Sequence, residues 1–177
     1  MKIFITRMFG AAMLDSTTYE AVEADQDVTG QAVAVVVLAS AGLGLGWTGL
    51  EPGRAGAVVA LTLVALAGWV TWALLTYVIG TRFFAEAQTR SDPGELLRVL
   101  GFAAAPGVVG VLGLVPGLRP IVTAVTFLWL LAAMVIAIQH ALDFTSTTRA
   151  VAVCVTGWAV FVAMFWVIGI FFAPSVS

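Results

Sequence analysis

Two short polar stretches contain the side chains that could take part in proton transfer or ligand binding. The first is Gln139, His140 and Asp143, which close a long apolar segment; helical spacing would put Gln139 and Asp143 on one face. His140 with Asp143 could form a proton relay or half of a metal site. A zinc site, however, needs three or four ligands, and the chain has no second histidine. The alternative is that these side chains cap a helix end and pair with Arg149 or Arg98.

The second stretch is acidic. Five acids lie within residues 15–27, before the first long apolar segment, and Glu20, Glu23 and Asp27 recur at helical spacing. Thr17 to Glu20 has the pattern of a capping box, which predicts a helix start. Because an anionic leaflet repels an acidic helix, we expect this patch to dock on arginines of the same chain or on a basic partner. The alternative is a solvated patch.

Neither stretch completes a catalytic constellation. The sequence contains no H-E-x-x-H, no G-x-S-x-G and no pair of carboxylates within an apolar segment. Cys154 is the only cysteine, so no disulfide framework can form. We therefore expect a non-enzyme with no catalytic residues, no cofactor and no metal. The net charge of −2 argues against a nucleic-acid partner, which requires a basic surface.

The remainder of the chain is very apolar. Of the 177 residues, 61% are hydrophobic and 10% are charged, and the mean hydropathy is +1.06. A soluble domain carries about 25% charged residues, so this composition predicts a protein in contact with the lipid bilayer. Five continuous apolar segments are each long enough for a helix that crosses a hydrocarbon core of about 30 Å. They cover approximately residues 31–50, 55–79, 97–118, 120–142 and 150–172.

These segments predict an all-α polytopic membrane protein. We expect residues 29–177 to form a bundle of five transmembrane helices, and residues 1–28 to form a short cytoplasmic or interfacial helical segment. Its first part predicts an amphipathic helix in the membrane interface. The apolar face of that helix would carry Phe4, Ile5, Met8, Phe9 and Ala12, opposite Lys2, Thr6 and Gly10.

The distribution of positive charge predicts the orientation, because arginine and lysine resist translocation. Six of the eight basic residues fall on the N-terminal side of the predicted spans, and two fall on the other side. This favours a cytoplasmic N-terminus and an outside C-terminus. The six are Lys2, Arg7, Arg82, Arg90, Arg98 and Arg149, and the two are Arg54 and Arg119.

The third apolar segment has a defined start and an interruption. Asp92, Pro93 and Glu95 provide an N-cap, a proline at the first helical position and a glutamate at the third. Pro106 lacks an N–H and should break the helix. Broken membrane helices often line sites or cavities, although a structural kink is the alternative.

Small residues predict close helix packing. Gly42 and Gly46 form one small-xxx-small pair, and Gly113 and Gly117 form another. Such pairs serve packing within one chain or between two copies. Between the first two apolar segments, Glu51–Pro52–Gly53–Arg54 predicts a tight turn.

The order of these features resembles the bacterial branch of the Yip family, five-span proteins related to eukaryotic Ypt/Rab-interacting membrane proteins. The resemblance covers roughly residues 14–172. It is carried by Glu95–Leu96–Leu97–Arg98–Val99–Leu100, then Gly101–Phe102–Ala103–Ala104–Ala105–Pro106, Trp129, Gln139–His140–Ala141–Leu142–Asp143 and Arg149–Ala150.

The resemblance implies a five-helix fold with a cytoplasmic N-terminus, membrane-protein partners and location in the cytoplasmic membrane of a bacterium. Eukaryotic members are associated with vesicle trafficking and Rab GTPases. This sequence has only about 28 residues before its first span instead of their long cytosolic region, so that function is not carried over. The candidate functional positions are Arg98, Gly101, Pro106, Gln139, His140, Asp143 and Arg149, with Glu20, Glu23 and Asp27 as candidates for partner docking.

Two functions compete. The first is a non-enzymatic scaffold or assembly partner for other membrane proteins, or a homo-oligomer, supported by the resemblance and the acidic patch. The second is a transporter, channel or lipid-handling protein that uses a cavity beside Pro106. No acid or base lies near the middle of any predicted span, which argues against an ion-coupled carrier but leaves a hydrophobic substrate open.

Overall fold

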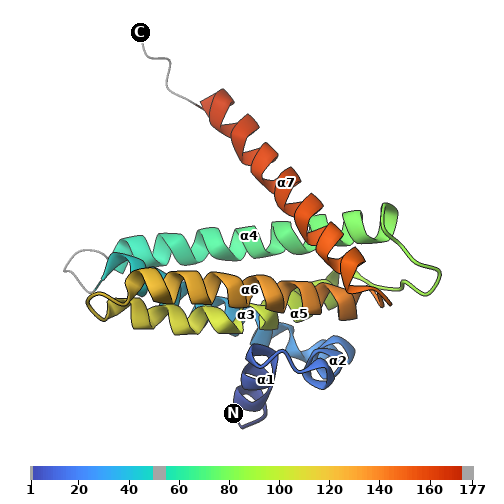
Figure 1. Cartoon of the computed structure of the whole chain (residues 1–177), viewed down its shortest axis with the longest axis horizontal. Helices are drawn as coiled ribbons and strands as arrows, with labels where there is room; N and C mark the ends of the chain where they lie inside the picture. The colour runs from blue at the N-terminus through green and yellow to red at the C-terminus, as the bar shows by residue number, and fades with distance from the viewer. Residues whose placement is uncertain (1, 50–54, 173–177) are drawn as a thin grey trace.

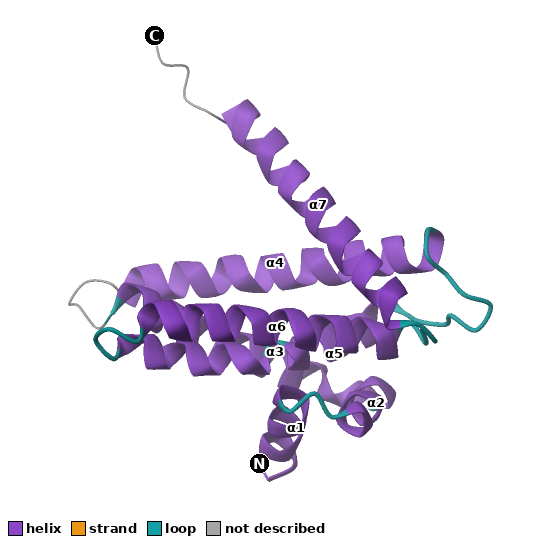
Figure 2. Cartoon of the chain, viewed as in Figure 1, coloured by secondary structure: helices purple, strands orange, loops and turns teal. Residues whose placement is uncertain are grey.

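The computed structural model describes residues 2–49 and 55–172, and these residues form helices and no strand (Figure 2). The predicted all-α fold is therefore confirmed. The predicted turn at Glu51–Pro52–Gly53–Arg54 lies outside the described residues. The elements are α1 (Lys2–Ala12), α2 (Ser16–Ala24), η1 (Gln26–Val28), α3 (Thr29–Thr48), α4 (Ala55–Arg82), α5 (Pro93–Ala103), η2 (Ala105–Leu114), α6 (Arg119–Ala141) and α7 (Thr147–Phe172), where η marks a 3-10 helix.

Five helical segments are long and apolar enough to cross a membrane, as predicted. The segments α3, α4, α5 with η2, and α6 run side by side, whereas α7 begins against α4 and α6 and then diverges from the bundle (Figure 1). Large apolar side chains point outward from α4 and α6; Leu63 and Leu128 are 62% and 65% exposed. Outward apolar faces on long helices are the surfaces that contact lipid.

The third span begins as its sequence predicts and then changes helix type. The Asp92 carboxylate accepts hydrogen bonds from the N–H groups of Gly94 and Glu95, and the Glu95 carboxylate accepts one from the Asp92 N–H. This capping box starts α5 at Pro93, as the Asp92–Glu95 pattern predicts, four residues before the predicted apolar span at residue 97. Near Pro106, the α-helix gives way to the ten-residue 3-10 helix η2, because proline cannot donate the next α-helical hydrogen bond.

Glycines allow α3 and η2 to pack with their backbones in contact. A Cβ on Gly42 would lie 2.8 Å from the Val108 carbonyl oxygen, and a Cβ on Gly46 would overlap the Gly110 carbonyl oxygen. These small residues therefore serve packing within the chain. Gly117, by contrast, lies in the turn after η2 with φ +83°, a left-handed conformation that favours glycine.

The N-terminal helices α1 and α2 pack on one side of the bundle and cross the direction of its helices (Figure 1). Tyr19 and Val22 of α2 are fully buried and belong to the core cluster of the bundle. The predicted capping box at Thr17 was wrong. Asp15 is the N-cap, and its carboxylate accepts hydrogen bonds from the N–H and hydroxyl of Thr17 and from the hydroxyl of Thr18.

Candidate functional site

A cavity of about 370 Å³ opens at the end of the bundle that is formed by the α4–α5 loop (residues 83–92) and the α6–α7 loop (residues 142–146), here named the polar end. Four of the side chains around it are carboxylates, and we name it the acidic pocket. It is lined by Glu20, Glu23, Ala24, Glu95, Gln139, His140, Asp143 and Phe144.

Three elements bring these carboxylates together. Helix α2 contributes Glu20 and Glu23 from successive turns, and the first turn of α5 contributes Glu95. Helix α6 ends where Asp143 adopts a left-handed conformation with φ 52°. The N–H groups of Asp143 and of the next residue then donate to the carbonyls of His140 and Gln139, which closes the helix end and leaves Asp143 on the rim of the pocket.

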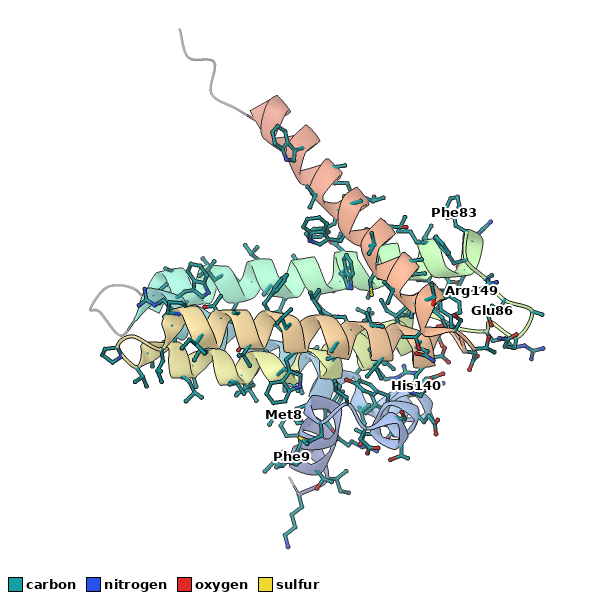
Figure 3. The ribbon with its side chains drawn as sticks, viewed as in Figure 1. Met8, Phe9, Phe83, Glu86, His140 and Arg149 are labelled. Carbon is teal, nitrogen blue, oxygen red and sulfur yellow. The ribbon has the colours of Figure 1, made fainter. Side chains whose placement is uncertain are left out.

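His140 contacts α2. Its ring stacks on the Tyr19 ring, with centroids 6.2 Å apart and planes 11° from parallel, and its Nδ1 lies 3.9 Å from Glu20 Oε1. Figure 3 shows His140 at the junction between the bundle and the N-terminal helices. The side chain of Gln139 accepts a hydrogen bond from the Thr147 hydroxyl at 2.9 Å. These contacts join the end of α6 to α2 and to the start of α7, and none of them is the expected pairing with Arg149 or Arg98.

The pocket does not have the geometry of a metal site. In the part of the chain that the structure describes, no group of three or more histidine, cysteine, aspartate and glutamate side chains is arranged to hold a metal ion. Its chemistry is that of an electronegative surface that can accept a cationic group.

Glu23 experiences the strongest electrostatic effect in the pocket. Partial burial, together with the charges of Asp143, Glu95 and Glu20, raises the pKa of its carboxyl to about 7 against the opposing effect of Arg98. Ionised Glu23 is therefore poorly compensated within the chain. A cation in the pocket would stabilise its charged form.

The arginines do not neutralise the pocket. Arg98 is buried, with 5% of its surface exposed, and its Nη2 donates to the Glu23 backbone carbonyl at 2.8 Å, not to a carboxylate. Arg149 pairs with Glu86 at 2.9 Å. Among the described residues, the other ion pair of an arginine joins Arg7 to Asp25, so neither pair includes a pocket carboxylate.

The Glu86–Arg149 pair fastens the α4–α5 loop to the start of α7 (Figure 3). Hydrogen bonds from the backbone N–H and hydroxyl of Thr145 hold the pKa of Glu86 below its ordinary value, and Arg149 adds to this effect. Arg149 also donates to the Phe84 carbonyl at 3.2 Å. Sequence patterns gave no signal for Glu86, because its partners are far away in the chain.

The other candidate residues lie outside the pocket. Asp27 is exposed on η1. Gly101 is buried where α5 meets α3, and a Cβ there would lie 2.7 Å from the Ala32 Cβ. Pro106 is buried in η2 and does not line the pocket. The acidic pocket thus unites Glu20, Glu23, Gln139, His140 and Asp143, and adds Glu95, whose role the sequence indicated only as a helix cap.

Five helical segments long and apolar enough to cross a bilayer, with outward apolar faces on α4 and α6, define a polytopic integral membrane protein. The chain matches the Yip1 domain over residues 13–168, nearly its whole length, and it belongs to the Yip1 family. The predicted resemblance to the Yip family is confirmed. The family is not in general one of enzymes. No curated protein and no solved structure matches the chain significantly.

Proposed function

We propose that this protein is a non-enzymatic membrane scaffold that holds a membrane-protein partner through a basic segment bound in the acidic pocket. The observation that carries this proposal is the excess of negative charge in the pocket, which the nearby Arg98 offsets only in part. Four carboxylates surround an open cavity, while the described arginine ion pairs are formed elsewhere. A lysine or arginine side chain in the cavity would supply the missing positive charge.

The arrangement favours binding from water. The cavity is at the polar end, where Glu20 and Asp143 are exposed, so a partner can reach it without crossing the hydrocarbon core. Binding that depends on several carboxylates weakens as salt is added, because mobile ions screen the attraction. We therefore expect the partner to dissociate more readily at high ionic strength.

The distribution of basic residues supports an orientation with the pocket in the cytoplasm. Six of the eight lysine and arginine residues lie on the polar side of the spans. We infer that the N-terminal segment of residues 1–28 lies on the cytoplasmic side of the bilayer, that the C-terminus is outside, and that the membrane is the cytoplasmic membrane of a bacterium.

Packing around Pro106 favours the scaffold over the transporter. The glycine-rich side of η2 lies against α3, and the space that a Cβ on Gly107 would take is occupied by Ala39, 2.9 Å away. The described pocket is lined by residues of other elements and of the α6–α7 loop. A translocation route beside Pro106 would require α3 and η2 to separate.

The test is affinity purification from native membranes in mild detergent, with quantitative mass spectrometry of the retained proteins. We expect a stoichiometric partner that is lost in the double variant Glu20→Lys/Glu23→Lys. Asp27→Lys, which reverses an exposed charge outside the pocket, is the matched control and should keep the partner. Because reversing the half-buried Glu23 can disturb folding, Glu20→Gln/Glu23→Gln is measured as well and should also weaken the complex.

Two results would contradict the proposal. One is a partner retained by both pocket variants. The other is the absence of any stoichiometric partner, including a second copy of the chain, in membranes where the protein is folded.

A further inference from the structure

Helix α1 is apolar on its outer face as well as on its inner face. Phe4 and Met8 pack against the core cluster, whereas Ile5, Phe9 and Met13 recur every four residues and are 54%, 66% and 60% exposed. Met8 and Phe9 are labelled on α1 in Figure 3. A helix that lies on a protein in water has a polar outer face. The outer face of α1 is instead apolar, like the lipid-facing surfaces of α4 and α6.

The C-terminal carbonyls of α1 receive donors from the protein. The Tyr19 hydroxyl donates to the Ala11 carbonyl at 2.9 Å, and Trp129 Nε1 donates to the Ala12 carbonyl at 2.6 Å. In water such carbonyls need no protein donor, because solvent satisfies them. In hydrocarbon each unsatisfied carbonyl costs several kcal/mol. The Ala11 carbonyl also accepts from the Leu14 N–H at 3.1 Å, so Trp129 is the side-chain donor that the Ala12 carbonyl requires at a site without water.

The polar side chains of α1 are also satisfied locally. Arg7 pairs with Asp25 at 2.8 Å, and the Thr6 hydroxyl donates to the Lys2 carbonyl at 3.1 Å. Lys2 lies at the first position of the helix, where a long side chain can extend towards the headgroups.

The contact with α6 fixes the depth of α1. Trp129 precedes Gln139 by ten residues on α6, which corresponds to about 15 Å of helix. That length is about half of a hydrocarbon core of about 30 Å. Since Gln139 and His140 line the water-accessible pocket, the end of α1 lies far below the polar end of the bundle.

We propose that α1 is inserted among the acyl chains of the leaflet on the polar side of the bundle, lying across the helix bundle with Ile5, Phe9 and Met13 in contact with lipid. Its partner is the hydrocarbon of one leaflet. This insertion anchors α2, so that the acidic pocket is held at the level of the headgroups. The proposal does not depend on what the pocket binds.

Spin labels in proteoliposomes of phosphatidylcholine and phosphatidylglycerol test the depth. In a Cys154→Ala background, a nitroxide is attached at Phe9→Cys, with Leu128→Cys on α6 as the lipid-facing control and Ala21→Cys on α2 as the aqueous control. We expect position 9 to resemble position 128, with high collision rates with oxygen and low rates with a water-soluble nickel chelate. A nickel accessibility equal to that of position 21 would overturn the proposal.

A second measurement uses hydrogen exchange of α1 in the same liposomes. A charged side chain in hydrocarbon is strongly disfavoured, so Phe9→Asp should speed exchange of α1 amides by on the order of tenfold or more. Phe9→Leu, which remains apolar, should leave exchange unchanged. If α1 faces water, neither substitution will change the rate, and the proposed insertion is then wrong.

Discussion

Replacing Glu23 with glutamine should strengthen the docking of α2 on the bundle at neutral pH. Glu23 is partly buried among the carboxylates of Glu20, Glu95 and Asp143, and its pKa is raised to about 7. Glutamine has nearly the same shape but carries no charge. The substitution therefore removes the cost of ionising this site and retains the packing of α2.

The magnitude follows from the pKa of Glu23. Each pKa unit corresponds to about 1.4 kcal/mol, so the rise from 4.5 to about 7 sets an upper limit of roughly 3 kcal/mol. The carboxylate is partly exposed, and solvent screening reduces this to about 1–2 kcal/mol. Because the pKa of Glu23 is raised in the docked state, the protonated carboxyl stabilises the docking of α2. This stabilisation is complete below pH 4.5 and is lost as the pH rises through about 7.

The free energy of docking of α2 can be measured by hydrogen exchange of its backbone amides in liposomes. The exchange rates are measured from pH 4.5 to pH 8 and corrected for the intrinsic rates. At pH 8 we expect exchange in Glu23→Gln to be about 5–30-fold slower than in the wild type, with the difference vanishing near pH 4.5. Asp27→Asn, which removes an exposed acid outside the pocket, should follow the wild type. If Glu23→Gln keeps the wild-type pH dependence, the electrostatic reasoning fails.

Three further substitutions test the packing. Trp129→Phe leaves the Ala12 carbonyl without its donor, so α1 should open more easily by about 1–3 kcal/mol, and unchanged exchange in α1 would contradict that role. Gly46→Ala would push a Cβ into a carbonyl of η2 and should lower the thermal unfolding temperature by several degrees, whereas Gly44→Ala, with its nearest neighbour 3.8 Å away, should not. Asp92→Ala removes the N-cap of α5 and should cost about 1 kcal/mol of stability in denaturant titration; an unchanged midpoint would show that the cap is dispensable.

The fold was predictable because its main signals are local. Long apolar runs require helices in lipid, and the Asp92 to Glu95 pattern identified the start of α5 because capping depends on residues three positions apart. Pro106 likewise marked the change of helix type. The start of α2 was misassigned because Asp15 and Thr17 are both good cap residues, and the carboxylate of Asp15 accepts hydrogen bonds from both following threonines.

The site was only partly predictable. The sequence identified Glu20 and Glu23 on one helix and Asp143 after another, but their proximity depends on how α2 packs across α5 and α6. Glu95 was interpreted as a cap, and no pattern indicated that it also faces the pocket. The bond from Trp129 to the end of α1 joins residues 117 positions apart, and periodicity within one helix carries no information about it.

Photo-crosslinking in intact cells tests most directly whether the acidic pocket binds a basic partner segment. A photoreactive phenylalanine replaces Ala24, which lines the pocket, and in a control protein it replaces Ala87, an exposed residue of the α4–α5 loop. We expect one dominant crosslink from position 24 to a lysine- or arginine-rich segment of a membrane protein, and its loss with Glu20→Gln/Glu23→Gln. A crosslink of equal yield from position 87, or one that persists after the acids are neutralised, would contradict it.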